Sequence, residues 1–335
     1  MNDPKRKAYF RLGAGLVFSL VFMVLAARKV DWTRVLLSIR PAHGAWLLAG
    51  LAGTLATYLL FALRWRMIAR KAFALRTSEA FHYIMIGYLA NVVMPLRLGD
   101  VARGVLAARE TGARTVTVLA TMALERILDV AAILLLALLV SWKMAIPDPV
   151  RLAAISFAWA VAVAVLLFFS LLLLPETLKA KLLAMGERMP ERPLAFARGL
   201  ARQFKAGVGS LLDAALLARC VGLSLLAWGT FSGATLFFLY AFSFDLPWPA
   251  AVFVVVVVNL GSAIPSSPGF IGVYHYLVVL ALGVWAVPKS EALGYALATH
   301  GLNLLFYMAV GGACLWHKGL RLGQLRCPEK EDPAP

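Results

Sequence analysis

One apolar segment carries charged and hydroxyl side chains at helical spacing. Thr117, Thr121, Glu125 and Asp129 recur every four residues, so a helix would align them in one stripe, with Arg126 beside Glu125 in sequence. A charge inside a bilayer is costly unless it is paired or faces water. The stripe therefore indicates either a pathway for a substrate or for protons, or an internal salt bridge that locks helices together. Two acids with one nearby arginine predict a surplus negative charge.

A second polar face lies near the end of the chain. His300, Asn303 and Tyr307 fall on one side of a predicted helix, and we expect this face to be a partner for the stripe. The alternative is a histidine that is simply hydrogen-bonded within the protein.

Two proline- and glycine-containing segments interrupt apolar regions. Their candidate substrate-binding residues are Asn91, Pro95, Arg97, Gly99, Asp100 and Arg103 in the first, and Asn259, Pro265, Ser266, Ser267, Gly269 and His275 in or just after the second. Backbone without helical hydrogen bonds cannot face lipid, so both segments must be buried or line a cavity. With Arg97 and Arg103, the first segment could hold an anion such as phosphate. The alternative is that both arginines reach the membrane surface.

The composition determines what kind of protein must position these groups. Of 335 residues, 61% are apolar and 15% are charged, which excludes a disordered chain, a disulfide scaffold and an ordinary soluble enzyme. The 33 Lys and Arg outnumber the 17 Asp and Glu and give a net charge of +16. They lie mostly between apolar blocks, so they indicate membrane topology and anionic lipid rather than nucleic acid.

Six apolar segments are long enough to span a bilayer as helices. They are 10–27, 44–63, 115–142, 152–174, 219–242 and 291–316. Trp46 and Trp65 bracket the second segment, as expected at membrane boundaries. Arginine-rich connections, including one that begins at Arg64, are predicted to be cytoplasmic by the positive-inside rule.

That rule makes two apolar regions re-entrant. Segments 64–79 and 96–114 are both basic, so the region between them must enter and leave on the cytoplasmic side. Connections 243–249 and 288–290 are poor in Lys and Arg, so the apolar region between them enters from the opposite side. The fold predicted is an all-α polytopic membrane protein with about six spanning helices, two opposed re-entrant helical hairpins and both termini cytoplasmic.

The whole chain, 1–335, is expected to form one integral membrane domain. It contains a first re-entrant region at 80–114, a cytoplasmic amphipathic segment at 175–218 and a second re-entrant region at 250–287. The two interrupted segments share an Asn, Pro and Gly pattern, and each precedes a span with a threonine four residues before a polar side chain. Together with opposed insertion, this predicts an inverted repeat.

At these residues the chain resembles a known family. The quoted motifs are Asn91-Val-Val-Met-Pro-Leu-Arg-Leu-Gly-Asp-Val-Ala-Arg103, Glu125-Arg-Ile-Leu-Asp129 and Pro265-Ser-Ser-Pro-Gly-Phe-Ile-Gly272. They look like the flippase-like membrane domain of lysylphosphatidylglycerol synthases, and the resemblance covers nearly the whole chain. It implies translocation of lipid between leaflets, and a location in the bacterial inner membrane.

Three positions and the chain end depart from the family pattern. Asp100 stands where the family usually has Glu, and Phe270 and His275 stand where it has Gly and Glu, which puts any role of that last acid in doubt. The chain stops soon after Trp316, so we expect a membrane domain without the aminoacyl-transferase domain of the synthases.

These observations favour a lipid translocase that is not an enzyme. Arg97, Arg103 and Arg126 would hold an anionic headgroup, and Glu125 and Asp129 would gate it or carry protons. No nucleotide-binding loop motif is present, so ATP hydrolysis is not expected, and neither a cofactor nor a metal is predicted. The expected partner is a membrane lipid with an anionic headgroup, no nucleic acid is expected, and a homo-oligomer stays open. The alternatives are a membrane enzyme acting on a lipid-linked phosphate and a regulatory or assembly subunit.

Overall fold

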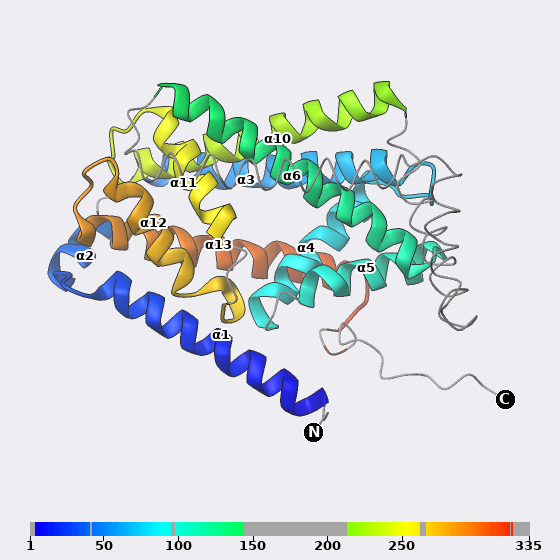
Figure 1. Ribbon diagram of the computed structural model, residues 1–335, viewed down its shortest axis with the longest axis horizontal. Coiled ribbons are helices and arrows are strands. Elements are labelled where there is room, and N and C mark those ends of the chain that lie inside the picture. Colours follow the sequence, from blue (N-terminus) through cyan, green and yellow to red (C-terminus); the bar gives the residue numbers. More distant parts are fainter. Residues whose placement is uncertain are drawn as a thin grey trace, which may run out of the picture.

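The regular elements of the protein are helices. The computed structural model describes residues 4–40, 42–94, 98–143, 213–261 and 266–321, with residue 323. Across these ranges the elements are α1 (Pro4–Ala27), α2 (Trp32–Ile39), α3 (Gly44–Ala69), α4 (Thr77–Val93), α5 (Leu98–Thr111), α6 (Thr115–Lys143), α10 (Ala214–Ala241), α11 (Trp248–Gly261), η3 (Pro268–Phe270), α12 (Val273–Gly283) and α13 (Lys289–His317) (Figure 1). The all-α membrane fold predicted from the sequence is confirmed.

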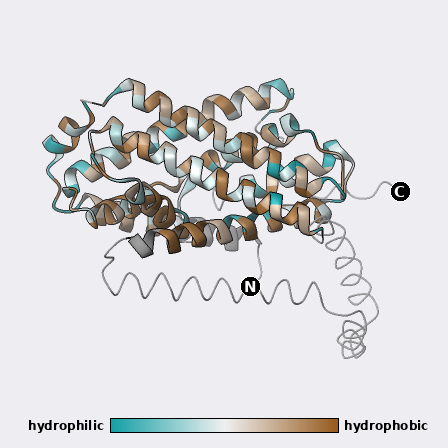
Figure 2. Ribbon diagram, turned by 90° about the horizontal axis from the view of Figure 1, so that it is seen from above, coloured by the Kyte–Doolittle hydropathy of each residue, from teal (hydrophilic) through white to brown (hydrophobic). Residues whose placement is uncertain are grey.

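Three described helices, α3, α10 and α13, are long and apolar enough to cross a membrane. The predicted spans 10–27 and 115–142 lie within α1 and α6, which have 24 and 29 residues. Hydrophilic residues concentrate in the loops at the two ends of the bundle (Figure 2). The predicted span 152–174 and nearly all of the amphipathic segment 175–218 lie outside the described residues.

Small residues allow α3 and α10 to pack closely in the middle of the bundle. A Cβ added to Gly53 would lie 2.9 Å from the Cβ of Ala234, and one added to Gly50 would lie 2.5 Å from the Phe238 ring. Close packing of this kind is a main source of helix association in membranes, where apolar burial alone gives no driving force.

Helices α4 and α5 form an antiparallel hairpin. The Tyr83 hydroxyl donates to Glu110 Oε2 at 2.7 Å near the open end, and the Gly99 amide donates to Asn91 Oδ1 at 2.9 Å near the tip. Between these contacts the backbones touch, because a Cβ on Gly99 would collide with the Gly87 carbonyl. Because Gly99 has no side chain, α4 and α5 can approach each other closely at this point.

Helices α11 and α12 pack on each other and are joined through a second tip. This tip contains three left-handed residues, with φ values of 69° at Gly269, 61° at Phe270 and 86° at Gly272. Helix α1 supports it, since the Ser267 amide donates to Ser19 Oγ at 2.7 Å. Left-handed backbone is unusual outside glycine, so Phe270 marks a strained turn.

One end of the bundle gathers the open end of the first hairpin. Arg70 Nη2, just after α3, lies 3.0 Å from Oδ2 of Asp213, the residue that caps the start of α10. Lys318, just after α13, forms an ion pair with Glu110 of α5. Chain segments that were all predicted to be cytoplasmic therefore lie together.

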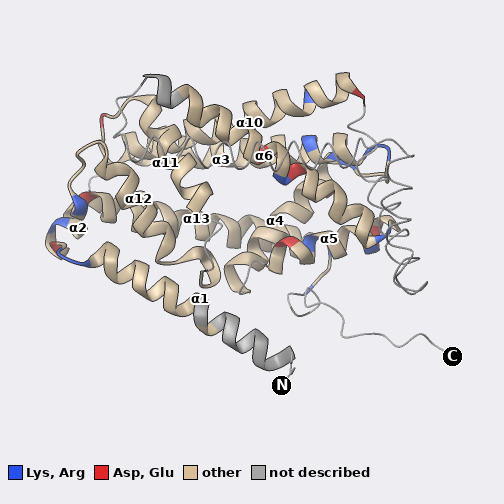
Figure 3. Cartoon of the chain, viewed as in Figure 1, with Lys and Arg blue, Asp and Glu red and all other residues tan. Residues whose placement is uncertain are grey.

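The other end gathers the two connections that were predicted to lie outside, 243–249 and 288–290, together with the Arg- and Lys-containing connection 28–43. The Asp31 amide donates to Ser290 Oγ at 3.1 Å, and the His43 amide donates to the Ala241 carbonyl at 2.8 Å. The second hairpin opens here, so the two hairpins are opposed. Charged residues gather at both ends, with a smaller group inside the bundle (Figure 3). Which end faces the cytoplasm stays a prediction.

Candidate functional site

The stripe of α6 faces other helices and is buried. Glu125 Oε2 accepts a hydrogen bond from Arg103 Nη2 of α5 at 2.9 Å, and its other carboxylate oxygen lies 3.8 Å from Arg64 Nη2 of α3. The side chains of Glu125, Arg103 and Arg64 are 3%, 6% and 1% exposed. This ion-pair group ties α3, α5 and α6 together.

Asp129, one turn further along α6, extends the group to α10. Arg64 Nη1 lies 2.8 Å from Asp129 Oδ1, and the indole N–H of Trp228 donates to the same oxygen at 3.0 Å. Arg64 Nη1 also donates to Ser224 Oγ at 2.7 Å. Buried charges with several hydrogen-bonding partners are those that a low-dielectric interior tolerates.

The predicted surplus of negative charge is wrong. The structure brings Arg64 and Arg103 to the two acids of the stripe, because α3 and α5 pack against α6. Sequence reasoning placed Arg64 in a cytoplasmic connection, whereas α3 continues to Ala69 and buries this side chain. The signal was present in the apolar residues that resume after Arg66 and extend the helix.

Trp65, which was predicted to sit at a membrane boundary, faces the protein interior. Its side chain is fully buried, and its indole N–H donates to Thr121 Oγ1 at 3.0 Å. The guanidinium carbon of Arg103 lies 4.9 Å from the centre of the Trp65 ring. Trp65 is therefore a cation–π partner that holds Arg103 against the stripe.

Arg126 differs from the two buried arginines because it is half exposed. Its Nη2 lies 3.2 Å from Asp100 Oδ2 of α5, its Nη1 lies 3.8 Å from Asp129 Oδ2, and its side chain is 51% exposed. Asp100 is itself 34% exposed. Both side chains reach a cavity at the centre of the bundle.

The cavity has a volume of about 460 Å³ and lies between the two hairpin tips. Its walls come from α3 to α6, α10 to α13 and both tips, and aromatic rings form much of them. The predicted site residues that line it are Asn91, Asp100, Arg126, Asn259, Ser266, Ser267, Gly269, His300 and Asn303. The other described site residues do not line the cavity. Gly99 lies where the helices of the first hairpin cross, and His275 lies at the start of α12. Arg103, Glu125 and Asp129 belong to the ion-pair group. Pro95, Arg97 and Pro265 lie outside the described residues.

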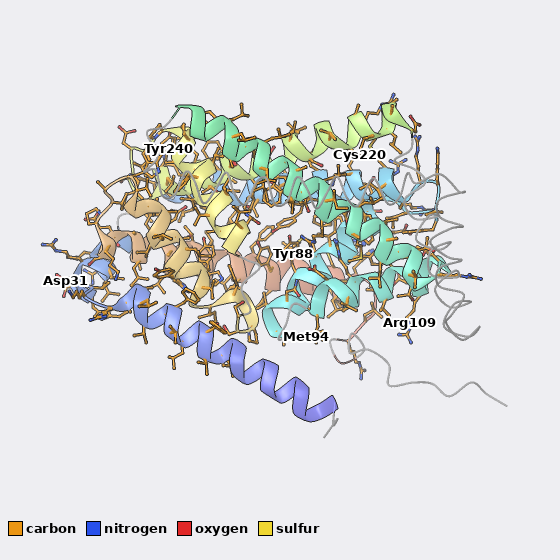
Figure 4. The ribbon with its side chains drawn as sticks, viewed as in Figure 1. Asp31, Tyr88, Met94, Arg109, Cys220 and Tyr240 are labelled. Atoms are coloured by element: carbon orange, nitrogen blue, oxygen red, sulfur yellow. The ribbon has the colours of Figure 1, made fainter. Side chains whose placement is uncertain are left out.

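Two tyrosines that sequence reasoning did not single out, Tyr58 and Tyr88, stand around the cavity together with Tyr307 of the predicted polar face. The hydroxyls of Tyr58 and Tyr307 share a hydrogen bond of 2.7 Å, and the Tyr88 ring stacks on Tyr307 with centroids 5.1 Å apart. Tyr88 lies at the centre of the molecule (Figure 4). Tyr88 precedes Asn91 by three residues, so both fall on one helical face, and this spacing could have identified it.

The polar face of α13 contributes to the cavity wall, while the stripe of α6 finds its ionic partners on other helices. Tyr307 binds Tyr58 of α3, and Asn303 Nδ2 donates to the Thr299 carbonyl at 2.9 Å. The stripe of α6 therefore contacts α3, α5 and α10, and not the polar face of α13 that was expected to be its partner.

His275 caps the start of α12. Its Nδ1 accepts a hydrogen bond from the amide of Gly272, the N-cap residue, at 3.1 Å. A glutamate three residues after the N-cap accepts the same bond in a capping box. His275, in the position where the resembling family has an acid, therefore performs that local structural role with a ring nitrogen.

Comparison with known proteins agrees with this architecture. The family model described as Lysylphosphatidylglycerol synthase TM region matches residues 13–311, which include both hairpins and every residue of the cavity wall. The chain is also similar to UPF0104 membrane protein MJ1078 of Methanocaldococcus jannaschii. The two are 25% identical over 234 residues, which cover 68% of this chain and 92% of that protein.

Proposed function

Since this chain belongs to the lysylphosphatidylglycerol synthase TM region family, we propose that it moves a lipid with an anionic headgroup between the two leaflets of a membrane. The proposed setting is the bacterial inner membrane, with both termini cytoplasmic and no ATP hydrolysis by the chain itself. The observation that carries the proposal is the central cavity, where two opposed hairpin tips meet beside a half-exposed arginine.

The cavity suits a headgroup rather than a whole lipid. A volume of about 460 Å³ is near the lower end of the range for small-molecule sites, so the acyl chains would stay in the bilayer. Aromatic walls lower the local dielectric and strengthen any charge interaction inside. Arg126 supplies the positive charge, and the amides of Asn91 and Asn303 and the tyrosine hydroxyls offer further hydrogen bonds.

Arg126 is the proposed headgroup contact because, among the described arginines, it is the one that reaches the cavity. Its side chain is 51% exposed there although it is paired with Asp100, so a ligand can approach the guanidinium. A phosphate in the cavity could accept two parallel N–H bonds from the guanidinium and replace Asp100. Of the three arginines expected to hold the headgroup, Arg126 keeps that role in this proposal, whereas Arg103 is committed to Glu125.

The buried acids have a structural role in this proposal. Glu125 and Asp129 each bind a buried arginine, and breaking such a pair would leave an uncompensated charge. They therefore hold α3, α5 and α6 in register around the cavity. Acids committed in this way are poor candidates for proton transfer, which supports transport over lipid-phosphate chemistry.

The order of elements supports an inverted-repeat mechanism. A long helix, a hairpin and a second long helix occur as α3 to α6 and again as α10 to α13. The hairpins open at opposite ends, so opening one tip at a time would expose the cavity to one leaflet at a time.

The test is lipid movement in vesicles that contain the purified protein. A fluorescent phosphatidylglycerol in the inner leaflet should become accessible to an external quencher only when protein is present. Arg126→Gln should reduce the rate at least tenfold, and Arg109→Gln, an exposed change at the end of α5, should leave it unchanged. An absence of protein-dependent movement with any anionic lipid would refute the proposal and favour a regulatory or assembly subunit.

A further inference from the structure

Two neighbouring histidines connect the second hairpin tip to α13. His275 Nε2 lies 3.4 Å from His300 Nδ1, and both residues are buried, at 4% and 7% exposed. The His300 ring also stacks on Tyr274, with centroids 4.3 Å apart. His300 lies on the cavity wall and His275 lies behind it.

The hydrogen-bond partners determine which ring nitrogens carry protons. The Gly272 amide can only donate, so His275 Nδ1 must be the bare nitrogen and Nε2 must carry the hydrogen. That N–H then points at His300 Nδ1, which accepts it. The chain of bonds runs in one direction, from Gly272 through both rings.

A proton cannot join this chain without breaking a bond in it. A charged His275 carries a hydrogen on Nδ1, which faces the hydrogen of the Gly272 amide. A charged His300 carries a hydrogen on Nδ1, which faces the hydrogen of His275 Nε2 unless His275 changes tautomer. That change again places a hydrogen against Gly272, so every protonated arrangement loses one of the two bonds.

The bonds concerned hold a strained segment. Gly269 and Gly272 are both left-handed, and Phe270 between them adopts a conformation that side chains rarely take. Such a turn persists only while its surroundings fix it, and the bond from the Gly272 amide to His275 fixes one of its glycines. Loss of this bond, or of the ring-to-ring bond that orients His275, favours relaxation of the segment that closes one wall of the cavity.

We propose that the His275–His300 pair is a proton-binding site that releases the second hairpin tip, so that lipid passage is coupled to proton uptake. This inference rests on the proposed transport function for its role, while the proton-binding site itself stands on the geometry of the tip. The proton arrives from the cavity, where His300 is accessible, and binding it opens the wall that Ser267, Gly269 and Phe270 form.

We expect the two histidines to be the groups that change charge with pH at this site. Tyr274 of α12 stacks on His300 and is the titratable side chain in contact with both rings, and its hydroxyl lies 3.4 Å from Thr299 Oγ1 of α13. Helix α1 contributes the Ser19 hydroxyl to the tip. Across the described ranges neither ring takes part in an ion pair, so a change of charge on the pair is not offset by a neighbour.

Glutamine variants test the site because they preserve its bonds without titrating. A glutamine oxygen at position 275 can accept from the Gly272 amide, and its NH₂ group can donate to the next side chain. The experiment compares wild type, His275→Gln/His300→Gln, and a control pair His82→Gln/His317→Gln. The rings of the two control histidines also lie side by side, with centroids 5.0 Å apart, but they are away from the cavity.

The first measurement is hydrogen exchange of peptides covering 266–273, corrected for the intrinsic effect of pH. In wild type and in the control, exchange should rise about tenfold from pH 7.5 to pH 5, the factor expected for loss of one buried hydrogen bond. The double glutamine variant should show no such rise. Equal protection of wild type at both pH values would overturn the proton-binding site.

The second measurement is lipid movement in vesicles over the same pH range. The rate should depend on pH in wild type and in the control, and should be independent of pH in the double glutamine variant. A pH dependence that persists in that variant would overturn the coupling. Failure of all proteins to move lipid, with exchange still sensitive to acid, would refute the transport function and leave the proton-binding site standing.

Discussion

Glu125→Gln is expected to destabilise the protein strongly although it changes few atoms. The amide oxygen can still accept a hydrogen bond from Arg103, but the negative charge that balances Arg103 and partly balances Arg64 is lost. Removing one partner of a buried ion pair leaves an uncompensated charge and lowers the free energy of unfolding by about 3–5 kcal/mol.

The geometry places most of this loss on Arg103. Its Nη2 lies 2.9 Å from Glu125, whereas the Arg64 contact at 3.8 Å is longer and Arg64 retains Asp129 at 2.8 Å. The Nε of Arg103 has no hydrogen-bond partner among the described residues, so the Glu125 carboxylate is its principal neutralising contact. Its remaining stabilisation comes from the Trp65 ring.

Denaturant unfolding in detergent, followed by tryptophan fluorescence, measures the effect. The control is Glu110→Gln, which breaks a partly exposed pair with Lys318 and should cost only about 0.2–1 kcal/mol. Adding Arg103→Gln to Glu125→Gln should recover most of the lost stability, because the unpaired charge is then gone. If Glu125→Gln costs less than its control, or if the double variant is the least stable, the buried-pair reasoning fails.

Three further changes test other parts of the structure. Gly99→Ala should destabilise the first hairpin by about 1–3 kcal/mol in the same unfolding assay, because its Cβ would collide with the Gly87 carbonyl, and an unchanged midpoint would contradict that close crossing. Asp100→Asn should tighten binding of an anionic lipid about two- to fivefold, since it removes the competing partner of Arg126, and weaker binding in a lipid titration would show that the carboxylate assists the site. Asp213→Ala should lower the unfolding temperature at pH 7, and lower it less as the pH falls below about 3.9. A backbone hydrogen bond at the start of α10 lowers the pKa of Asp213, so its contribution is present above the unfolded value of about 3.9 and is lost as pH falls through the lower folded value; an effect that stays the same as the pH falls would contradict this.

The hairpins could be predicted because charge patterning constrains topology. The structure pairs Tyr83 with Glu110 across the predicted first hairpin, but most of the segment 96–114, which was expected at the cytoplasmic surface, is the return helix α5, and it buries Arg103 beside Glu125. The two interrupted segments were expected to be buried or to line a cavity, and Asn91 and Asn259 do line it, although both lie in the last turns of α4 and α11 and not in non-helical backbone.

The partners of the stripe could not be predicted because they come from distant helices. Arg64 is followed by Trp65 and Arg66, and this local pattern is that of a helix end at a membrane surface. Only the packing of α3 on α6 shows that Arg64 faces Asp129. Similarly, no periodicity reveals that His275 and His300, 25 residues apart, share a hydrogen bond.

The meeting of the two tips near the middle of the bundle has an electrical consequence (Figure 1). Where two half-length hairpins separate the membrane faces, the voltage difference falls over a few residues instead of over a full span. One elementary charge that crosses this short barrier exchanges about 2.3 kcal/mol with a 100 mV potential. Passage of a charged headgroup between the tips would therefore register as a current, and the resting voltage of the cell would set its preferred direction.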